Sequence, residues 1–278
     1  MAQPDDKTKI KDEVKRFYGD MVAPSEGAGC CGGLPPTGIK ADPAHYSDRR
    51  LADLPKGLTL TSFGCGNPVD FMEVKPGETV LDLGCGTGLD LFLAAKKVGS
   101  NGRVIGIDMT PAMIARAQAN IAAAGATNIE VRQGEMEHLP VDDGSVDWVM
   151  SNCVINLSPD KGRVFAEIFR VLRPGGRMLV SDIVTIGDLS EAVRSDMRLW
   201  AGCIAGALDE GEFVDQARNA GLSEVRIVDR FLYDRPQLTA FISDCCSCGT
   251  KSEATAPPLE SLAGKIASAK IFARKPEK

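Results

Sequence analysis

Residues 80–88 combine an acidic residue with three glycines in a spacing that can bind a polar ligand. They read Val-Leu-Asp-Leu-Gly-Cys-Gly-Thr-Gly, and a segment of helical character follows from Leu89 to Val98. A parallel strand that enters a helix through a glycine turn presents free backbone N–H groups at one point. The glycines also let the chain turn tightly and let a ligand approach the backbone closely. Dinucleotide sites have the spacing Gly-x-Gly-x-x-Gly. This run has Gly-x-Gly-x-Gly instead, so we expect another class of ligand.

Cysteine is the second residue type with chemical potential, and the chain contains nine. Cys65 lies in Ser-Phe-Gly-Cys-Gly-Asn-Pro, Cys153 in Ser-Asn-Cys-Val-Ile-Asn-Leu, and Cys203 in Ala-Gly-Cys-Ile-Ala-Gly-Ala-Leu. A lone cysteine is most often a small buried hydrophobic residue. Cys153, however, follows a predicted strand, and ligands of open α/β sheets bind at the carboxyl ends of strands. Thiolates are soft ligands and suit a soft centre.

Two further groups of cysteines lie in segments that we predict to be irregular. Cys30 and Cys31 are in a segment rich in glycine and proline, 23–36, which we predict to be a loop. Cys245, Cys246 and Cys248 lack the Cys-x-x-Cys spacing of a zinc half-site. They either capture or hand over a metalloid, or they form a surface cluster of thiols.

Alternating apolar strands and helices must position these residues, and such alternation is typical of a parallel sheet with helices on both faces. The helix between Thr110 and Gly125 has clear signals, because Thr110 can cap its start, Pro111 fits its first turn and Gly125 can end it. The predicted strands are 79–83, 103–107, 129–133, 146–151, 177–183, 225–231 and 267–274. The other predicted helices are 11–18, 89–98, 158–172, 190–208 and 212–220.

The composition excludes several classes of protein. The 278 residues carry a formal net charge of −6 with a pI of about 5.1, whereas a nucleic-acid-binding protein usually has a basic face. No segment approaches the roughly 18 consecutive apolar residues of a membrane span. The polar start of the chain, Met1–Lys11, shows no secretory signal. We therefore expect a cytoplasmic protein with mostly reduced cysteines, and neither nucleic acid nor membrane as a partner.

With Asp82 in place, the glycine run resembles motif I of the class I S-adenosylmethionine (SAM) methyltransferases. The resemblance implies an α/β, Rossmann-like sheet of seven mostly parallel strands, with a terminal antiparallel hairpin and substrate-binding insertions. It also implies that Asp108 accepts hydrogen bonds from the ribose of SAM. An acidic side chain in the loop after the third strand would lie near the adenine, and we favour Glu135 over Glu137. The predicted cofactor-binding residues are Asp82, Gly84, Cys85, Gly86, Thr87, Gly88, Asp108, Met109, Glu135, Met136 and Asn152.

The surroundings of Cys65, Cys153 and Cys203 together resemble the arsenite methyltransferases, over roughly residues 40–235. The resemblance implies that these three cysteines bind trivalent arsenic and position it for methylation. It also implies an N-terminal cysteine that assists Cys65 and forms a disulfide with it during turnover. The spacing does not choose between Cys30 and Cys31 for this role, and a loop without the role is the alternative.

We therefore expect a SAM-dependent enzyme that methylates trivalent arsenic, as arsenite or a thiol conjugate, in a detoxification reaction. It would need a thiol reductant such as glutathione or thioredoxin. Residues 1–70 form an N-terminal segment, 71–185 the SAM-binding core, and 186–278 a region that binds substrate and completes the sheet. One alternative is a methyltransferase acting on carbon, oxygen or nitrogen of a small metabolite. Another is a thiol-based metalloid-binding protein without catalysis.

Overall fold

The computed structural model describes residues 4–22, 38–40, 46, 51–52, 54–239 and 262–278. The predictions for Cys30, Cys31, Cys245, Cys246 and Cys248, and for the loop at 23–36, concern residues outside this set. Within the described ranges, no helix is both long and apolar enough to cross a membrane.

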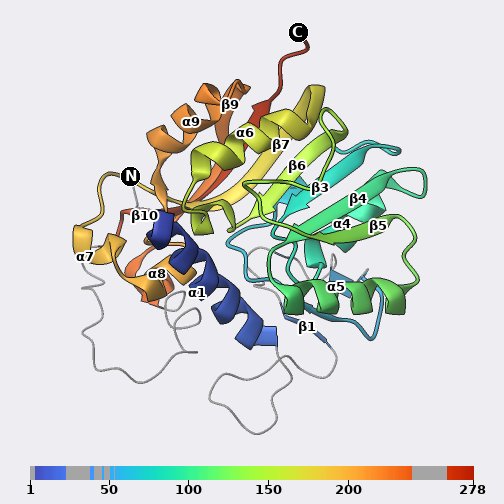
Figure 1. Cartoon of the computed structure of the whole chain (residues 1–278), viewed down its shortest axis with the longest axis horizontal. Helices are drawn as coiled ribbons and strands as arrows, with labels where there is room; N and C mark the ends of the chain where they lie inside the picture. Colours follow the sequence, from blue (N-terminus) through green and yellow to red (C-terminus); the bar gives the residue numbers. More distant parts are fainter. Residues whose placement is uncertain (1–3, 23–37, 41–45, 47–50, 53, 240–261) are drawn as a thin grey trace, which may run out of the picture.

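One large sheet organises the chain, with strands in the order β5-β4-β3-β6-β7-β10-β9 and with β8 paired to β7 outside this path (Figure 1). Neighbouring strands from β5 to β7 are parallel, and β10 is antiparallel to both β7 and β9. The bounds are β3 Thr79–Leu83, β4 Arg103–Asp108, β5 Ile129–Gln133, β6 Val146–Asn152, β7 Leu172–Thr185, β8 Leu208–Asp209, β9 Ser223–Leu232 and β10 Ile266–Arg274. A small parallel sheet pairs β1 (Gly38–Lys40) with β2 (Thr59–Thr61). The predicted Rossmann-like fold with its antiparallel end is confirmed.

The central strands of the large sheet are buried on both faces, to which successive side chains of a strand point in turn. Val80 of β3 packs with residues of α4 (Leu89–Val98) and α5 (Pro111–Ala124). Its neighbour Leu81 packs with residues of α6 (Lys161–Val171) and α9 (Glu210–Asn219). Parallel sheets are typically covered in this way. The sheet therefore gives a fixed base to the loops at its carboxyl edge.

Helix α5 begins and ends at the predicted signals. Thr110 is its N-cap residue, Pro111 is its first residue, and Gly125 ends it in the left-handed conformation with a φ of 61°. The Thr110 side chain makes no capping hydrogen bond. Its backbone N–H instead donates to the Asp108 carboxylate at 2.8 Å. The start of α5 is thus tied to the end of β4.

Helix α1 is longer than predicted, since it spans Pro4–Val22 and not 11–18. It contacts α5, α8 (Met197–Ala201) and the short 3-10 helix η1 (Ile155–Leu157). Figure 1 shows it beside α8. The first turns of α1 are highly charged, and the partners of these charges lie in distant segments of the chain. The local sequence pattern therefore predicts too short a helix.

The segment 190–208 is not one helix, contrary to the prediction. It contains α7 (Glu191–Arg194) and α8, followed by a tight turn. Cys203 in this turn has a φ of 62°, which an α-helix does not allow. A Cβ on Gly206 would lie 2.2 Å from the carbonyl oxygen of Asn156. The glycine therefore lets the turn pack directly against the loop after β6.

Two other elements complete the frame around the site. Helix α3 (Pro68–Phe71) is capped by Asn67, whose side chain accepts a hydrogen bond from the N–H of Asp70. Strand β7 begins at Leu172, which pairs with Val146 of β6. After a register shift, the regular pairing runs on from Arg177, which lies opposite Trp148. Both elements lie next to segments that carry cysteines.

Candidate cofactor and thiol site

The glycine turn between β3 and α4 requires glycine at its first position for two reasons. Gly84, Gly86 and Gly88 have φ values of 68°, 52° and 98°, which glycine adopts without steric cost. At Gly84, a Cβ would also lie 2.5 Å from the side chain of Val154. The turn therefore packs directly against the loop that carries Cys153.

Asp108 braces this turn from the end of β4. Its carboxylate accepts hydrogen bonds from the backbone N–H groups of Gly86 at 3.0 Å and Thr110 at 2.8 Å. Burial raises the pKa of Asp108, although these hydrogen bonds oppose the shift. A carboxylate has about four acceptor positions. It can therefore still accept hydrogen bonds from the hydroxyl groups of a ligand.

A cleft of about 970 Å³, counting the space at its open mouth, is lined by the glycine turn, α1 and the carboxyl ends of several strands. Glu137, the less favoured of the two candidate glutamates, contributes to its wall. The predicted cofactor residues that line it are Asp82, Gly84, Cys85, Gly86, Asp108, Met109, Met136 and Asn152.

Three carboxyl groups give this cleft an acidic wall. Asp82, Asp90 and Asp108 all line it. Burial, together with the charges of Asp90 and Asp108, raises the pKa of Asp82. Burial also raises the pKa of Asp90 to about 6. Because clustered carboxylates favour positive charge nearby, the cleft suits a ligand that carries a cation.

Three predicted cofactor residues do not line the cleft. The hydroxyl of Thr87 is 2.8 Å from the N–H of Thr61 and 3.0 Å from its carbonyl oxygen, so it ties the glycine turn to β2. Gly88 is the left-handed N-cap of α4. Glu135 is turned toward α1, where lysines bind its carboxylate. In this structure these residues support the wall and do not form it.

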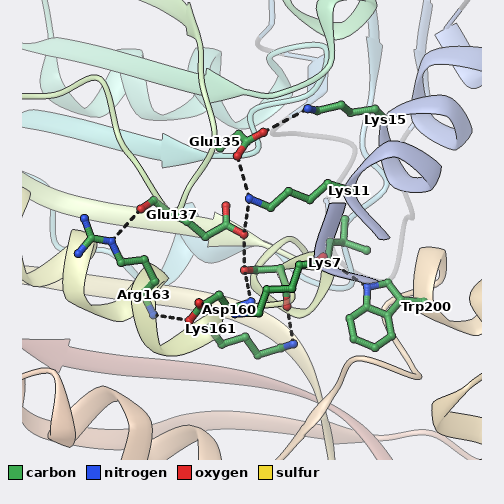
Figure 2. Close-up of polar contacts among 11 residues, drawn as sticks. Lys7, Lys11, Lys15, Glu135, Glu137, Asp160, Lys161, Arg163 and Trp200 are labelled. Carbon is green, nitrogen blue, oxygen red and sulfur yellow. Dashed lines mark hydrogen bonds and ion pairs between the residues drawn. The ribbon is translucent and has the colours of Figure 1, made fainter. Parts of the chain in front are cut away.

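The lysines of α1 reach across to the loop after β5 and to the start of α6 (Figure 2). Lys11 lies 2.8 Å from Glu135 and 3.2 Å from Glu137, and Lys15 lies 3.2 Å from Glu135. Lys7 lies 2.8 Å from Asp160. Burial lowers the pKa of Lys11, but its hydrogen bonds and charge interactions with both glutamates outweigh burial and raise it. These ion pairs hold α1 over one side of the cleft.

The three predicted arsenic ligands are brought together in one buried cluster. Cys65, Cys153 and Cys203 are 1%, 3% and 3% exposed and share a hydrophobic cluster. Cys65 and Cys153 form a disulfide. The Sγ of Cys203 donates a hydrogen bond to the carbonyl oxygen of Cys153 at 2.9 Å. Cys153 also lines the cleft, whereas Cys65 and Cys203 lie behind it.

Asp182 of β7 lies beside the sulfurs of Cys65 and Cys153, and the sequence had not marked it as a site residue. One carboxylate oxygen lies within 4.8 Å of the sulfurs of both Cys65 and Cys153. Its carboxylate accepts hydrogen bonds from the Asn156 amide and from the N–H of Ile183, both at 2.9 Å. Burial raises its pKa to about 7. The available signal was an acidic residue within an apolar predicted strand.

The arrangement places a small-molecule cleft in contact with the bonded sulfur pair of Cys65 and Cys153, with Cys203 held against the backbone of Cys153. Cys153 belongs to both, because it lines the cleft, is bonded to Cys65 and accepts the hydrogen bond of Cys203. Sulfur ligands suit soft metals and metalloids. Two reactants held in adjoining pockets react faster because their encounter and orientation are already fixed.

Comparison with known proteins agrees with this chemistry. A family described as a methyltransferase domain matches residues 74–222. An arsenite methyltransferase of Halobacterium salinarum is 40% identical over 257 residues, covering 88% of this chain and 64% of the relative. One of Mus musculus is 31% identical over 259 residues, covering 88% and 67%. The crystal structure of an arsenic(III) S-adenosylmethionine methyltransferase from Chlamydomonas reinhardtii superposes with a TM-score of 0.66 at 34% identity, covering 82% and 72%.

The chain spans about 64% of the length of the Halobacterium relative, so the relatives contain sequence beyond the matched part. Within that matched part lie the glycine turn, the acidic wall and the thiol cluster. By these similarities, the chain belongs to the arsenite methyltransferase family, whose cofactor is S-adenosylmethionine.

Proposed function

We propose that this protein methylates trivalent arsenic that is bound by the thiolates of Cys65, Cys153 and Cys203. The observation that carries the proposal is the position of Cys153, which lines the cleft and contacts both other cysteines. Arsenic held by Cys153 would face whatever occupies the cleft. The role in detoxification follows from the loss of free arsenite through this reaction.

The cleft residues fit SAM by their chemistry. The glycine turn admits close approach to the backbone, Asp108 offers acceptors for ribose hydroxyls, and the acidic wall matches the cationic charge of SAM. We assign the adenine to the side of Met136 and Glu137, both of which line the cleft. When bound, SAM would supply an electrophilic methyl group to the lone pair of sulfur-bound arsenic, and S-adenosylhomocysteine would be the leaving group.

Arsenite binding by this chain requires deprotonated sulfur. Each thiol that bonds to arsenite loses its proton, and the arsenic loses a hydroxide, so one water forms for every As–S bond. A thiol has an ordinary pKa near ~8.5 and is mostly protonated at neutral pH. Because this exchange releases no net proton, the equilibrium affinity for arsenite should change little with pH below the ordinary thiol pKa, whereas the rate of binding should rise with the thiolate fraction.

The disulfide between Cys65 and Cys153 must be opened before arsenic can bind both sulfurs. Opening consumes two electrons, which two thiol molecules supply as they form a disulfide of their own. We propose glutathione or a thioredoxin-like protein as this reductant, and the reducing cytoplasm as the place of the reaction.

The test is an assay for methylated arsenic with purified protein, arsenite, SAM and a thiol reductant. Formation of methylarsenic species, measured by chromatography with mass detection, is the expected result. A protein that binds arsenite but leaves SAM unconsumed would be a metalloid-binding protein without catalysis. SAM consumption with a small metabolite and none with arsenite would point to an ordinary metabolite methyltransferase.

A further inference from the structure

A buried polar network joins the acidic wall of the cleft to the loop that carries Cys65. Its members are Tyr46, Asp90 of α4 and Asn152 at the end of β6. The Tyr46 hydroxyl donates to the Asp90 carboxylate, with distances of 2.9 and 3.1 Å to its two oxygens. The Asn152 amide nitrogen lies 2.9 Å from the Tyr46 hydroxyl and 3.1 Å from Asp90. Tyr46 is fully buried and does not line the cleft.

The same Asn152 side chain clamps the backbone next to Cys65. Its amide nitrogen donates to the carbonyl oxygen of Gly66 at 2.7 Å, and its amide oxygen accepts from the N–H of Gly66 at 3.2 Å. A Cβ on Gly64 would lie 2.1 Å from the Asn152 side chain. The loop therefore touches Asn152 on both sides of Cys65.

Asn152 is also the residue before Cys153, so one side chain links the backbones of both cysteines. The orientation of its amide depends on its partners, because each of its polar atoms contacts a fixed group. Tyr46 and Asp90 contact the same amide nitrogen that donates to the carbonyl oxygen of Gly66. Without them, the amide could rotate, and the clamp on the Cys65 loop would loosen.

We propose that Tyr46 and Asp90 are positioning residues that act through Asn152 to hold Cys65 at bonding distance from Cys153. For arsenic, this inference rests on the proposed function, because two preplaced thiols bind one arsenic atom more tightly than two mobile ones. For the disulfide, it stands independently. A preplaced pair of thiols also forms its disulfide more readily when it competes with an external thiol.

The central experiment uses Tyr46→Phe, which removes one hydroxyl and keeps the ring. The wild type and the variant are equilibrated with reduced and oxidised glutathione. The reaction converts the Cys65–Cys153 disulfide and two glutathiones into two protein thiols and one glutathione disulfide. Alkylation and peptide mass spectrometry then quantify this one pair among the nine cysteines. Ser223→Ala is the control, since it also removes one hydroxyl that donates a hydrogen bond, here to the carbonyl oxygen of Arg274 and outside the network.

We expect the equilibrium constant for closing the disulfide to fall about tenfold in Tyr46→Phe, as suits the loss of one buried hydrogen-bonding group. The control should stay within about twofold of the wild type. The reduced Tyr46→Phe protein should also bind arsenite, measured without SAM, more weakly than the reduced wild type and the reduced control. Affinity for S-adenosylhomocysteine should stay nearly constant, because Tyr46 does not line the cleft. Loss of all three properties together would show a general structural role and overturn the proposal.

Asp90→Asn is the second variant, and it keeps the shape of the side chain while it replaces an acceptor oxygen by a donor. It should lower the same disulfide equilibrium constant. Unchanged constants in both variants would overturn the positioning role. If the wild type fails to bind arsenite while Tyr46→Phe still shifts the disulfide equilibrium, the proposed function fails and the positioning role stands.

Discussion

Cys65 and Cys153 form a disulfide although 88 residues separate them in sequence, and their Cα atoms lie 5.8 Å apart. The first lies in the loop before α3 and the second in the loop after β6, so only the folded chain brings them together. Cys203 reaches the same place from a third segment and donates its hydrogen bond to Cys153. The pair is therefore preformed in the folded protein, and a reductant converts it into a dithiol.

Replacing single cysteines should separate the ligands of arsenic by substrate. Cys153→Ser or Cys203→Ser exchanges a soft ligand for a protonated hydroxyl, so methylation should fall to background for arsenite and for monomethylarsenic(III). Monomethylarsenic(III) has one position filled by carbon and needs only two thiolates. Cys65→Ser should therefore impair arsenite methylation much more than monomethylarsenic(III) methylation. Product formation on both substrates is the measurement.

The matched controls for these variants are Cys246→Ser and Cys248→Ser, which we expect to leave the chemical step intact. Substitution of Cys30 and Cys31 together should resemble Cys65→Ser if either assists it. An equal loss on both substrates for Cys65→Ser contradicts the division into two permanent ligands and one accessory ligand.

Asp108→Ala should weaken SAM binding by roughly ten- to a hundredfold. It removes a carboxylate hydrogen-bond acceptor worth about 1.5–3 kcal/mol, and it also frees the N–H of Gly86 in the glycine turn. Calorimetric titration measures the dissociation constant. Asp209→Ala is the control, because Asp209 caps α9 and does not line the cleft. A folded Asp108→Ala protein with wild-type affinity would remove Asp108 from the cofactor site.

Lys11→Met should speed the dissociation of SAM by up to about fivefold. Lys11 lines the cleft and pairs with Glu135 and Glu137, and a partly exposed ion pair contributes up to about 1 kcal/mol. Added salt should speed dissociation from the wild type more than from the variant, because it screens these pairs. Stopped-flow displacement measures both effects. Arg16 lies on the same helix but pairs with Glu13, so Arg16→Met should change neither the dissociation rate nor its salt dependence. Equal behaviour of the two variants would contradict a role of the Lys11 ion pairs in retaining SAM.

Asp182 should make the protein less stable as the pH rises from 5 to 8. Burial raises its folded pKa from the ordinary 3.8 to about 7, so the folded protein holds a proton that the unfolded chain has already released. Stability from this group is complete below the unfolded pKa and is lost as the pH approaches 7. The unfolding free energy of the wild type should therefore fall relative to that of Asp182→Asn by about 2 kcal/mol between pH 5 and 8.

Denaturant unfolding of the oxidised proteins measures this difference, since Cys65 and Cys153 do not titrate in the disulfide. The amide of the variant loses one acceptor, but that cost does not depend on pH. A constant difference between the two proteins across this range would show that Asp182 titrates near its ordinary value.

Local sequence signals predicted the parts of the site that one element can specify. Helix α5 begins after Thr110 and ends at Gly125 as expected, although the Thr110 side chain makes no capping hydrogen bond. The glycine turn followed from its own spacing. These features required no knowledge of distant contacts.

The features that sequence reasoning did not predict depend on partners far along the chain. Glu135 is held by Lys11, which lies 124 positions away, so its direction could not be read from its own loop. Asp182 approaches the cysteines only because β7 lies beside β6. Cys203 lies in a tight turn and not in the predicted helix, because Gly206 packs against Asn156. In each case tertiary packing outweighed the local pattern.

A single-turnover reaction tests the central claim most directly. The reduced protein is loaded with one equivalent of arsenite and then mixed with SAM, and S-adenosylhomocysteine and methylated arsenic are measured together over time. We expect equal amounts of both products, formation only when arsenite is present, and neither product from Cys153→Ser. S-adenosylhomocysteine that forms without arsenite, or in Cys153→Ser as fast as in the wild type, would contradict it.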